Sequence, residues 1–285
     1  MSLSIIIPVY NEERGVASVI GQIKKAMSGL GVTYEIIVVD DGSSDKSAEL
    51  AASEGAAIIR HNSNRGYGAA LKTGVNKSKY GQVLILDADG SYPVKDIPLL
   101  IEKSKDSDMV VGARTGSNVN IPLLRRPAKF ILNALANYLS EAKIPDLNSG
   151  FRIIKKEAIL RFLHILPNGF SFTTTITLAM LVNDYRVSYV PIDYHKRTGR
   201  SKINPIKDTM NFFLLIIRTI MYFNPLKIFL PLSGFLFILG VFVFLYSYFI
   251  LDRVMDVATI LLVATAIQVA VIGLLADLID KRIEK

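Results

Sequence analysis

The chain has 285 residues, 51% of them hydrophobic, with no cysteine and no tryptophan, and its 33 Lys and Arg against 25 Asp and Glu leave a formal charge of +8. The apolar content excludes a disordered chain, and the lack of cysteine excludes a disulfide-stabilised secreted module, a thiolate metal site and a cysteine nucleophile. The mean hydropathy of +0.36 is high for so basic a chain, so we expect apolar and basic residues to lie in different regions.

The first 115 residues alternate short apolar runs with helical patterns. Runs typical of buried strands fall at residues 3–8, 34–39, 57–60, 83–86 and 108–112. Helical stretches fall at about 16–30 and 68–78, with one of about ten residues after the second run. This alternation predicts a mostly parallel sheet with helices on both faces. Ligands of such sheets bind beyond the carboxyl ends of the strands, where most polar clusters of this region lie.

Polar clusters follow the first two predicted strands. The first comprises Pro8, Tyr10, Asn11 and Glu12, and the second comprises Asp40, Asp41, Gly42 and Ser43. Paired carboxylates at a strand end can bind a metal ion or accept hydrogen bonds from a base and a ribose, but Asp-Gly-Ser is also common turn chemistry. The second cluster, taken alone, leaves a functional site and an ordinary turn equally open.

A third cluster, Asp87-Ala88-Asp89-Gly90-Ser91, follows the fourth predicted strand. If the strand continues, alternation points Asp87 and Asp89 to the same side, and two hard oxygen ligands suit Mg²⁺ or Mn²⁺. A metal ion there could bridge two phosphates and neutralise a diphosphate leaving group. The alternative is a solvated turn with a helix-capping Asp.

A glycine-containing segment, Asn64 to Gly68 with Gly74 further on, precedes the helix at residues 68–78. Its spacing fits neither the P-loop nor the dinucleotide-binding fingerprint. A phosphate-binding loop and a close-packed helix start are therefore both open for this segment.

An amphipathic helix is predicted from residue 204 to residue 225. Asn204 is a typical N-cap, and Pro205 suits the first helical position. Apolar residues then recur at helical spacing, at positions 206, 210, 213, 214, 217, 220 and 221. We expect this helix to lie in the membrane interface with its apolar face down; an ordinary helix packed on the preceding domain is the alternative.

Two membrane-spanning helices are predicted after it. Residues 228–251 are 24 consecutive uncharged residues and residues 257–276 are 20 more. Each stretch can cross a hydrocarbon core of about 30 Å. Only residues 252–256 separate them, which predicts a tight helical hairpin. The absence of a polar face disfavours the alternative, a buried helix pair in a soluble core.

The basic residues predict the orientation of this hairpin. Arg253 is the one basic residue of the connecting loop, whereas Lys227 precedes the first span and Lys281 follows the second. The positive-inside rule therefore predicts a cell-membrane protein with two spans, whose N-terminal domain and both termini are cytoplasmic. We expect no signal peptide, because the apolar stretch at residues 5–9 is short and lacks a basic leader. The expected parts are residues 1–203, 204–225 and 226–285.

Taken in order, four motifs resemble those of glycosyltransferase family 2, which has a GT-A fold: PVYNEE at 8–13, DDGSSD at 40–45, NRGYGAALKTG at 64–74 and DADGS at 87–91. The resemblance covers roughly the first 115 residues. It implies an α/β nucleotide-sugar-binding domain in which a nucleotide is held by Pro8, Tyr10, Glu12, Asp40, Asp41 and Arg65. It further implies that Asp87 lies near the sugar diphosphate and that Asp89 binds Mg²⁺ or Mn²⁺, with Asp87 and Ser91 as the other candidate ligands.

Later segments are similar to those of dolichyl-phosphate mannose synthases and bacterial polyprenyl-phosphate glucosyltransferases. In these enzymes an Arg-rich segment, an SGFR motif and an R-x-x-G-x-S-K loop occur in this order, as they do here at 125–137, 149–152 and 197–202. By this resemblance the basic residues receive the phosphates of lipid and donor, and Asp146 orients Arg152 or a nearby basic group. The candidate catalytic residues are Asp87, Asp89, Arg125, Arg126, Lys129, Asp146, Arg152, Arg197, Ser201 and Lys202.

The spacing of the basic residues agrees with part of this assignment. Arg125, Lys129 and Asn133 are four residues apart and would share one helical face, where Arg offers bidentate donors to a phosphate. A solvated basic face is the alternative for Arg125 alone. The loop at 197–202 is rich in cationic and hydroxyl donors, although attraction to anionic headgroups could explain part of that charge.

Two departures from the family pattern affect the expected chemistry. Ser91 stands where relatives often carry Gln or Asp, and residues 173–175 are threonines where many relatives carry a glutamate. The absence of tryptophan excludes the Q-x-x-R-W motif of processive polysaccharide synthases of this family.

These features predict an inverting transferase that moves one sugar from a nucleotide-sugar, of the UDP-glucose or GDP-mannose type, to a polyprenyl phosphate (undecaprenyl or dolichyl) at the membrane. A phosphate monoester is largely ionised at pH 7, so no strong general base is required. The alternatives are another lipid or lipid-linked saccharide as acceptor, or a non-catalytic membrane subunit. We expect no nucleic-acid partner, because no basic groove motif accompanies the charge. The sugar, the lipid, the pathway and the oligomeric state stay open, with a homo-oligomer among the options.

Overall fold

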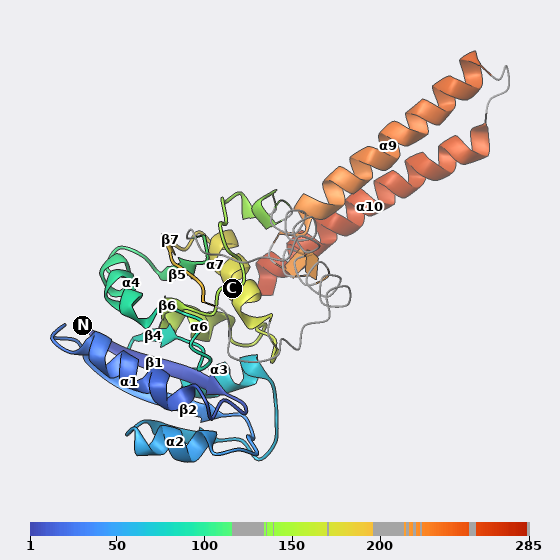
Figure 1. The fold of residues 1–285 in the computed structure, drawn as a ribbon. Helices are drawn as coiled ribbons and strands as arrows, with labels where there is room; N and C mark the ends of the chain where they lie inside the picture. The colour runs from blue at the N-terminus through green and yellow to red at the C-terminus, as the bar shows by residue number, and fades with distance from the viewer. Residues whose placement is uncertain are drawn as a thin grey trace. The chain divides into compact units, whose positions relative to one another are not determined.

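The computed structural model describes residues 1–115, 134, 136–138, 140–169, 171–195, 214, 217–218, 221–222, 224–250 and 255–283. The chain divides into two compact units, Met1–Ile216 and Ile217–Lys285, which we describe separately (Figure 1). The division falls inside the predicted juxtamembrane helix at 204–225, most of which lies outside the described residues. The expected boundaries at 203 and 225 therefore stay predictions.

The first unit is built on a sheet of seven strands in the described part of the chain, in the order β3-β2-β1-β4-β6-β5-β7. Every pairing is parallel except those of β6, which runs antiparallel to both β4 and β5. The strands are β1 Ser2–Val9, β2 Thr33–Asp40, β3 Ala57–Arg60, β4 Gln82–Ile85, β5 Met109–Ala113, β6 Arg152–Lys155 and β7 Val187–Pro191. The mostly parallel sheet and its first five strands confirm the prediction.

Helices connect these strands, and the first three of them are predicted by the sequence pattern. They are α1 Val16–Met27, α2 Ser47–Ser53, α3 Tyr67–Lys77, the short 3₁₀ turn η1 Val94–Asp96, α4 Ile97–Lys103, α6 Lys156–Phe162 and α7 Phe172–Val182. The predicted helix of about ten residues after β2 is the seven-residue α2. The predicted helix start at residue 16 is confirmed, although α1 ends at Met27 rather than at residue 30.

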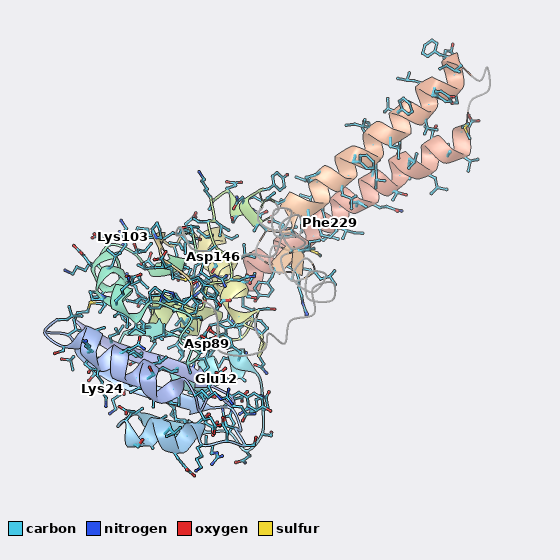
Figure 2. The ribbon with its side chains drawn as sticks, in the orientation of Figure 1. Glu12, Lys24, Asp89, Lys103, Asp146 and Phe229 are labelled. Atoms are coloured by element: carbon cyan, nitrogen blue, oxygen red, sulfur yellow. The ribbon has the colours of Figure 1, made fainter. Side chains whose placement is uncertain are left out.

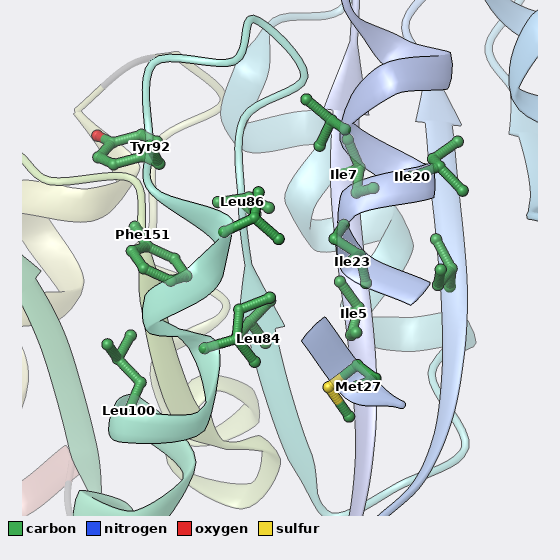
Figure 3. Packing of buried hydrophobic residues seen from close by; sticks show 14 of the residues in the cluster. Ile5, Ile7, Ile20, Ile23, Met27, Leu84, Leu86, Tyr92, Leu100 and Phe151 are labelled. Atoms are coloured by element: carbon green, nitrogen blue, oxygen red, sulfur yellow. The ribbon is translucent and has the colours of Figure 1, made fainter. Parts of the chain in front are cut away.

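Alternation along β1 sends its side chains into two layers. Ile5 and Ile7 belong to a buried cluster with Ile20 and Ile23 of α1 (Figure 3). Ile6 points the other way, where α3 lies so close that a Cβ on the glycine at position 74 would come within 2.5 Å of the Ile6 side chain. Both faces of the sheet are therefore covered, which explains why the strand is apolar throughout instead of alternating with polar residues.

The direction of β6 determines which segments meet at one edge of the sheet. Its first residue, Arg152, pairs with Ile85 at the end of β4 and with Val111 near the end of β5. Because β6 is antiparallel, the residues just before it lie at the same edge as the residues just after β4 and β5. Residues 146–151 thus arrive at the edge where the parallel strands end.

The second unit is a pair of long apolar helices, α9 Leu226–Phe249 and α10 Asp256–Ile283. Both are long and apolar enough to cross a membrane, and most of their large side chains are exposed rather than packed in a core. These helices contain the predicted spans with small differences at the ends. The predicted loop charge, Arg253, lies outside the described residues.

Small residues at intervals of seven bring the two helices of this unit together. Ser233, Gly240 and Ser247 recur on α9, and the Ser233 hydroxyl donates to the carbonyl oxygen of Ala266 at 2.8 Å. A Cβ on Gly240 would lie 3.1 Å from the side chain of Val263. Close approach of small residues is the usual way in which helices associate in an apolar surrounding, where the hydrophobic effect cannot drive them together.

Candidate active site

The turns after β1 and β2 interlock through hydrogen bonds. The backbone N–H of Asn11 donates to the Ser43 hydroxyl at 3.0 Å, and the N–H of Glu12 donates to the Ser47 hydroxyl at 2.8 Å. The Asn11 side chain in turn accepts the backbone N–H of Ser44 at 2.9 Å. Hydrogen bonds therefore hold the first two predicted clusters together. Pro8 belongs to β1, and Tyr10 is exposed.

Asp40 is the last residue of β2 and is fully buried. Its Oδ1 accepts the backbone N–H of Ser43 at 2.9 Å. Its Oδ2 lies 2.9 Å from Nε of Arg60 but accepts no hydrogen bond from any residue that the structure describes. A buried carboxylate oxygen in this condition is energetically unfavourable unless a donor such as a base N–H approaches it.

Asp41 has a different environment. Its Oδ1 accepts the backbone N–H of Arg65 at 2.9 Å, and its Oδ2 accepts that of Gly66 at 2.8 Å. The ring of His61 also contacts Oδ1, at 2.6 Å from Nδ1. These bonds tie Asp41 to the segment before α3, whose Arg65 side chain is exposed.

The start of α3 is close-packed, which decides between the two readings left open for the glycine-containing segment. The backbone N–H of Ala69 donates to the carbonyl oxygen of Asn168 at 3.1 Å, so a protein group occupies this helix start. A Cβ on Gly66 would come within 2.5 Å of the same oxygen, and one on Gly68 would overlap the carbonyl of Pro167. The glycines are thus required by the contact with residues 167–169 rather than by a phosphate.

The Asp87-to-Ser91 segment forms a turn beyond β4. The strand ends at Ile85, so the strand alternation expected for Asp87 and Asp89 does not hold. The Tyr67 hydroxyl donates to Asp87 Oδ1 at 3.0 Å, and Asp89 Oδ1 accepts the N–H of Ser91 at 3.0 Å and its hydroxyl at 2.6 Å. These bonds fix the rotation of both carboxylates.

The Tyr67 phenol is a hydrogen-bond donor and not a base at neutral pH. Burial, followed by the negative charge of Asp87, raises the pKa of Tyr67 well above its usual range. The proton is therefore retained and directed to the Asp87 carboxylate. The Asp87-to-Ser91 turn lies close to the start of α1, because a Cβ on Gly15 would overlap the carbonyl oxygen of Ala88. Glu12, which precedes α1, and Asp89 are labelled in Figure 2.

The donor set at this turn fits a hard divalent cation. Asp87 and Asp89 offer carboxylate oxygens, the ligands that Mg²⁺ and Mn²⁺ prefer. Among the residues that the structure describes, no group of three or more His, Asp or Glu side chains could hold a metal ion. We propose Asp87 and Asp89 as protein ligands of such an ion, with diphosphate oxygens and water as the other ligands.

The segment before β6 packs directly against Asp87. The N–H of Gly150 donates to the Tyr92 hydroxyl at 2.7 Å. A Cβ at position 150 would lie 2.9 Å from Asp87 Oδ2 and 3.1 Å from the Tyr67 hydroxyl oxygen. The DADGS motif at 87–91 and the SGFR motif at 149–152 therefore meet at this point, although about 60 residues separate them in the sequence.

Replacing Gly150 with alanine should displace the Asp87 carboxylate, because the added methyl group has no room. We expect sugar transfer to fall about 100-fold, the usual consequence of a displacement of about 1 Å at a reacting centre. The free energy of unfolding should fall by about 1–3 kcal/mol. Gly21→Ala is the matched control, since a Cβ there meets nothing within 4 Å. Full transfer by Gly150→Ala, measured on folded protein, would contradict the assignment.

Arg152 is fully buried, contrary to a simple picture of a phosphate-binding surface residue. Its guanidinium donates to the carbonyl oxygens of Ser149 and Thr173 and, at 2.9 Å, to the Thr177 hydroxyl. Burial lowers its pKa from the usual arginine value. These contacts link the start of β6 to the first turn of α7, so we assign Arg152 a positioning role as a proposal.

Asp146 is buried and pairs with Arg114, a residue that the sequence reasoning missed. Its Oδ2 accepts Nε of Arg114 at 2.7 Å and the Arg114 backbone N–H at 2.9 Å, and its Oδ1 accepts Nη2 at 2.9 Å. The Arg114 guanidinium also stacks over the ring of Tyr194, 5.2 Å from its centroid. Of the two partners expected for Asp146, Arg152 or a nearby basic group, these bonds are made to the second, which is Arg114. The position of Arg114, two residues after the predicted strand at 108–112, was the available signal.

The threonines at 173–175 are buried at the start of α7. The Thr174 hydroxyl donates to the side-chain oxygen of Asn148 at 2.6 Å. Thr175 returns its hydroxyl to the carbonyl of Ser171 within the helix, at 3.0 Å. Thr174 therefore orients the Asn148 carboxamide two residues before the contact with Asp87, which gives one of these hydroxyls a place in the site.

Six predicted catalytic residues lie outside the described part of the chain: Arg125, Arg126, Lys129, Arg197, Ser201 and Lys202. Their roles stay predictions. The two segments that carry them begin directly after Arg114 and Tyr194, at the ends of β5 and β7, which run side by side.

The family model for glycosyl transferase family 2 matches residues 4–163 of the chain. A second model, the GtrB C-terminal hairpin, matches residues 224–281. These two matches contain all four motifs of the first 115 residues, the SGFR segment and the pair of apolar helices.

Curated relatives agree with the family match. The dolichyl-phosphate hexose transferase of Haloferax volcanii is 30% identical over 205 residues, which cover 71% of this chain and 87% of that protein. The undecaprenyl-phosphate 4-deoxy-4-formamido-L-arabinose transferase of Pseudomonas paraeruginosa is 31% identical over 258 residues, which cover 83% and 72%. The low-salt glycan biosynthesis hexosyltransferase Agl6 of Haloferax volcanii is 28% identical, and the match spans about half, 51%, of that longer protein and 73% of this chain.

A solved structure supports the fold. Glucosyl-3-phosphoglycerate synthase from Mycobacterium tuberculosis, crystallised with UDP, aligns with a TM-score of 0.62 at 19% identity and covers 77% of this chain and 80% of that one. The same enzyme crystallised with Mn²⁺, UDP and phosphoglyceric acid aligns with a TM-score of 0.61 at 19% identity, with 77% of each chain covered. At this identity the likeness establishes the GT-A-like arrangement of strands and helices.

Proposed function

The chain belongs to glycosyl transferase family 2, and from that premise we propose that it moves one sugar from a nucleotide-sugar to a polyprenyl phosphate, with inversion at the anomeric carbon. The observation that carries this proposal is the contact between Asp87 and Gly150, which joins the Asp-x-Asp turn to the SGFR segment. The relatives named as dolichyl-phosphate and undecaprenyl-phosphate transferases support a polyprenyl phosphate as the acceptor.

The donor nucleotide would bind beside the ends of β1 and β2. The Oδ2 of Asp40 forms an ion pair with Arg60 but accepts no hydrogen bond from the described residues. It is suited to accept an N–H from a base, since both uracil and guanine offer one. Pro8, Tyr10 and Glu12 belong to the same interlocked turns, and the exposed Arg65 would approach the diphosphate. Asp41 would support this site indirectly, because its described hydrogen bonds are made to protein groups.

Asp89 and Asp87 would hold Mg²⁺ or Mn²⁺ against the diphosphate, with Ser91 fixing Asp89. When bound, such an ion neutralises charge that develops on the leaving nucleoside diphosphate. Tyr67 donates to Asp87, and Gly150 leaves its carboxylate room, so the protein positions the carboxylate before the donor arrives. Preorganised charge of this kind is typically a large part of the catalytic effect.

The acceptor phosphate would attack the anomeric carbon from the face opposite the diphosphate. One phosphate oxygen forms the new C–O bond while the bond to the diphosphate breaks, and the nucleoside diphosphate leaves with the electron pair. The acceptor is already largely anionic at neutral pH, so no residue has to remove a proton. The basic residues Arg125, Arg126, Lys129, Arg197 and Lys202 would balance the charge of the approaching phosphate.

The apolar helices α9 and α10 would span the cell membrane as a hairpin, with the catalytic unit and both termini in the cytoplasm. The match to the GtrB C-terminal hairpin supports membrane association. The cytoplasmic orientation is supported by charge, because Arg253 is the one basic residue in the loop between the helices.

The test uses membranes that contain the full chain, undecaprenyl and dolichyl phosphate, and a panel of labelled nucleotide-sugars including UDP-glucose and GDP-mannose. We expect one sugar to transfer label into a polyprenyl-phosphate lipid only when a divalent cation is present. Competition with short-chain polyprenyl phosphates should suppress the labelling. Label that appears in another lipid or a lipid-linked saccharide, and resists this competition, would overturn the acceptor assignment.

A further inference from the structure

His61 lies beside the proposed donor site, where its side chain contacts Asp41 and its backbone contacts Asp40. It is the residue directly after β3, and its backbone N–H donates to the carbonyl oxygen of Asp40 at 2.9 Å. The side chain is buried, with Nδ1 at 2.6 Å from Asp41 Oδ1 and Nε2 at 2.9 Å from the Thr73 hydroxyl. Both ring nitrogens are therefore engaged within the protein.

The direction of one of these hydrogen bonds is fixed by chemistry. An ionised carboxylate can only accept, so Nδ1 of His61 is the donor to Asp41. The other ring nitrogen, Nε2, is within hydrogen-bond distance of the Thr73 hydroxyl, so the ring is held at both nitrogens and keeps Asp41 in place.

Asp41 passes this constraint on to the segment before α3. It accepts the backbone N–H groups of Arg65 and Gly66, and the next residue, Tyr67, donates its hydroxyl to Asp87. Three consecutive residues thus join the two carboxylates that lie at the ends of β2 and β4. The backbone of this short segment has a special conformation, because Gly66 has φ 101°, a value that favours glycine.

The hydrogen bonds form a closed chain. One ring nitrogen of His61 contacts Asp41, which binds residues 65–66 directly before α3. The other ring nitrogen contacts Thr73, which belongs to α3 itself, so both routes from His61 lead to the same helix. Such a chain is rigid when every donor and acceptor in it has a hydrogen-bond partner. When one donor is removed, the remaining groups are no longer held in a single conformation.

We propose that His61 is a positioning residue of the donor site, which fixes Asp41 and through residues 65–67 sets the orientation of Asp87. This inference rests on the proposed function for the identity of the donor, and it does not depend on which acceptor the protein uses. His61 itself does not touch the nucleotide. Its loss should weaken the binding of the nucleoside diphosphate with its divalent ion, and it should leave the interaction with the lipid phosphate unchanged.

The experiment compares His61→Asn with His61→Gln in the purified full chain. The carboxamide N–H of asparagine can occupy the place of Nδ1 and donate to Asp41, whereas that of glutamine reaches the place of Nε2 and cannot. His164→Gln is the matched control at an exposed histidine. The dissociation constants of UDP and GDP are measured by calorimetry with Mg²⁺ or Mn²⁺, without acceptor, together with thermal midpoints and the KM for each substrate of transfer.

We expect His61→Gln to raise the dissociation constant of the bound nucleotide at least about tenfold, as loss of a supporting hydrogen bond does at other ligand sites. His61→Asn should stay within about threefold of the unaltered chain, and the KM for the acceptor should not change. Equal losses in both variants, or an altered thermal midpoint with unaltered nucleotide affinity, would overturn the proposal. Failure of polyprenyl phosphate to accept sugar would refute the proposed acceptor but leave this comparison intact. No binding of either nucleotide to the unaltered chain would overturn both.

Discussion

Replacing Asp89 with alanine should lower sugar transfer at least about 1000-fold while the catalytic unit stays folded. Asp89 is almost fully buried, and its carboxylate is held by the N–H and the hydroxyl of Ser91. The proposed divalent ion would lose one of two protein carboxylates, and the leaving diphosphate would lose its charge compensation. Transfer is measured in membranes over a range of Mg²⁺ and Mn²⁺ concentrations, and folding is checked by thermal unfolding.

Asp106→Ala is the control for this experiment, because Asp106 is exposed and lies at the opposite end of β5 from the site. It should transfer sugar like the unaltered chain. If Asp89→Ala turned over normally, or if added cation restored its activity fully at the same concentration as in the unaltered chain, Asp89 would not be a metal ligand.

Replacing Asp146 with alanine should have the largest effect on stability. Asp146 is buried and Arg114 is partly exposed, so removing the carboxylate leaves a partly buried charge without compensation, which should cost about 3 kcal/mol, the lower end for such pairs. Here the loss removes three hydrogen bonds to Arg114, two from its side chain and one from its backbone. The thermal midpoint of the catalytic unit should fall by about 6–12 °C. Hydrogen exchange at the backbone amide of Arg114 should become faster, since that amide loses its acceptor.

Glu54→Ala is the matched control for this prediction. Glu54 pairs with Lys24 at 3.5 Å, but both side chains are substantially exposed, so their pair should contribute about 1 kcal/mol or less. If Asp146→Ala and Glu54→Ala changed the thermal midpoint equally little, the Arg114–Asp146 pair would not stabilise the ends of β5 and β6 as we infer.

The first half of the fold was predictable because its signals are local. Each of the first five strands is a short apolar run that ends in polar turn residues, and each is seen within one or two residues of its expected bounds. The helix start at position 16 follows from the spacing of apolar residues on one face of α1. The parallel arrangement follows from strands that are apolar on both faces.

The antiparallel strand β6 was not predictable from the same signals. It has four residues, begins with a buried arginine, and pairs with residues at least 41 positions away, so neither its length nor its pattern is distinctive. The pairing of Arg114 with Asp146 depends on that strand. Sequence spacing could identify Asp146 as a candidate, but only the sheet order shows which cation it reaches.

The different roles of Asp40 and Asp41 show another limit. The two residues are adjacent and chemically identical, yet Asp41 is satisfied by three groups of the protein while one oxygen of Asp40 is left without a hydrogen bond among the described residues. This difference arises from His61 and residues 65–66, which lie 20 or more positions away. The DDGSSD motif alone therefore cannot assign different roles to its two adjacent carboxylates.

The antiparallel direction of β6 also has a consequence for the ends of β5 and β6. Arg114 directly follows β5 and pairs with Asp146, and the Ser149 hydroxyl donates to the carbonyl oxygen of Gly112 at 2.6 Å. Two chain segments more than 30 residues apart are therefore held together beside Asp87, where Gly150 packs against its carboxylate. The position of that carboxylate thus depends on the pairing of β5 with β6 as well as on the turn that contains it.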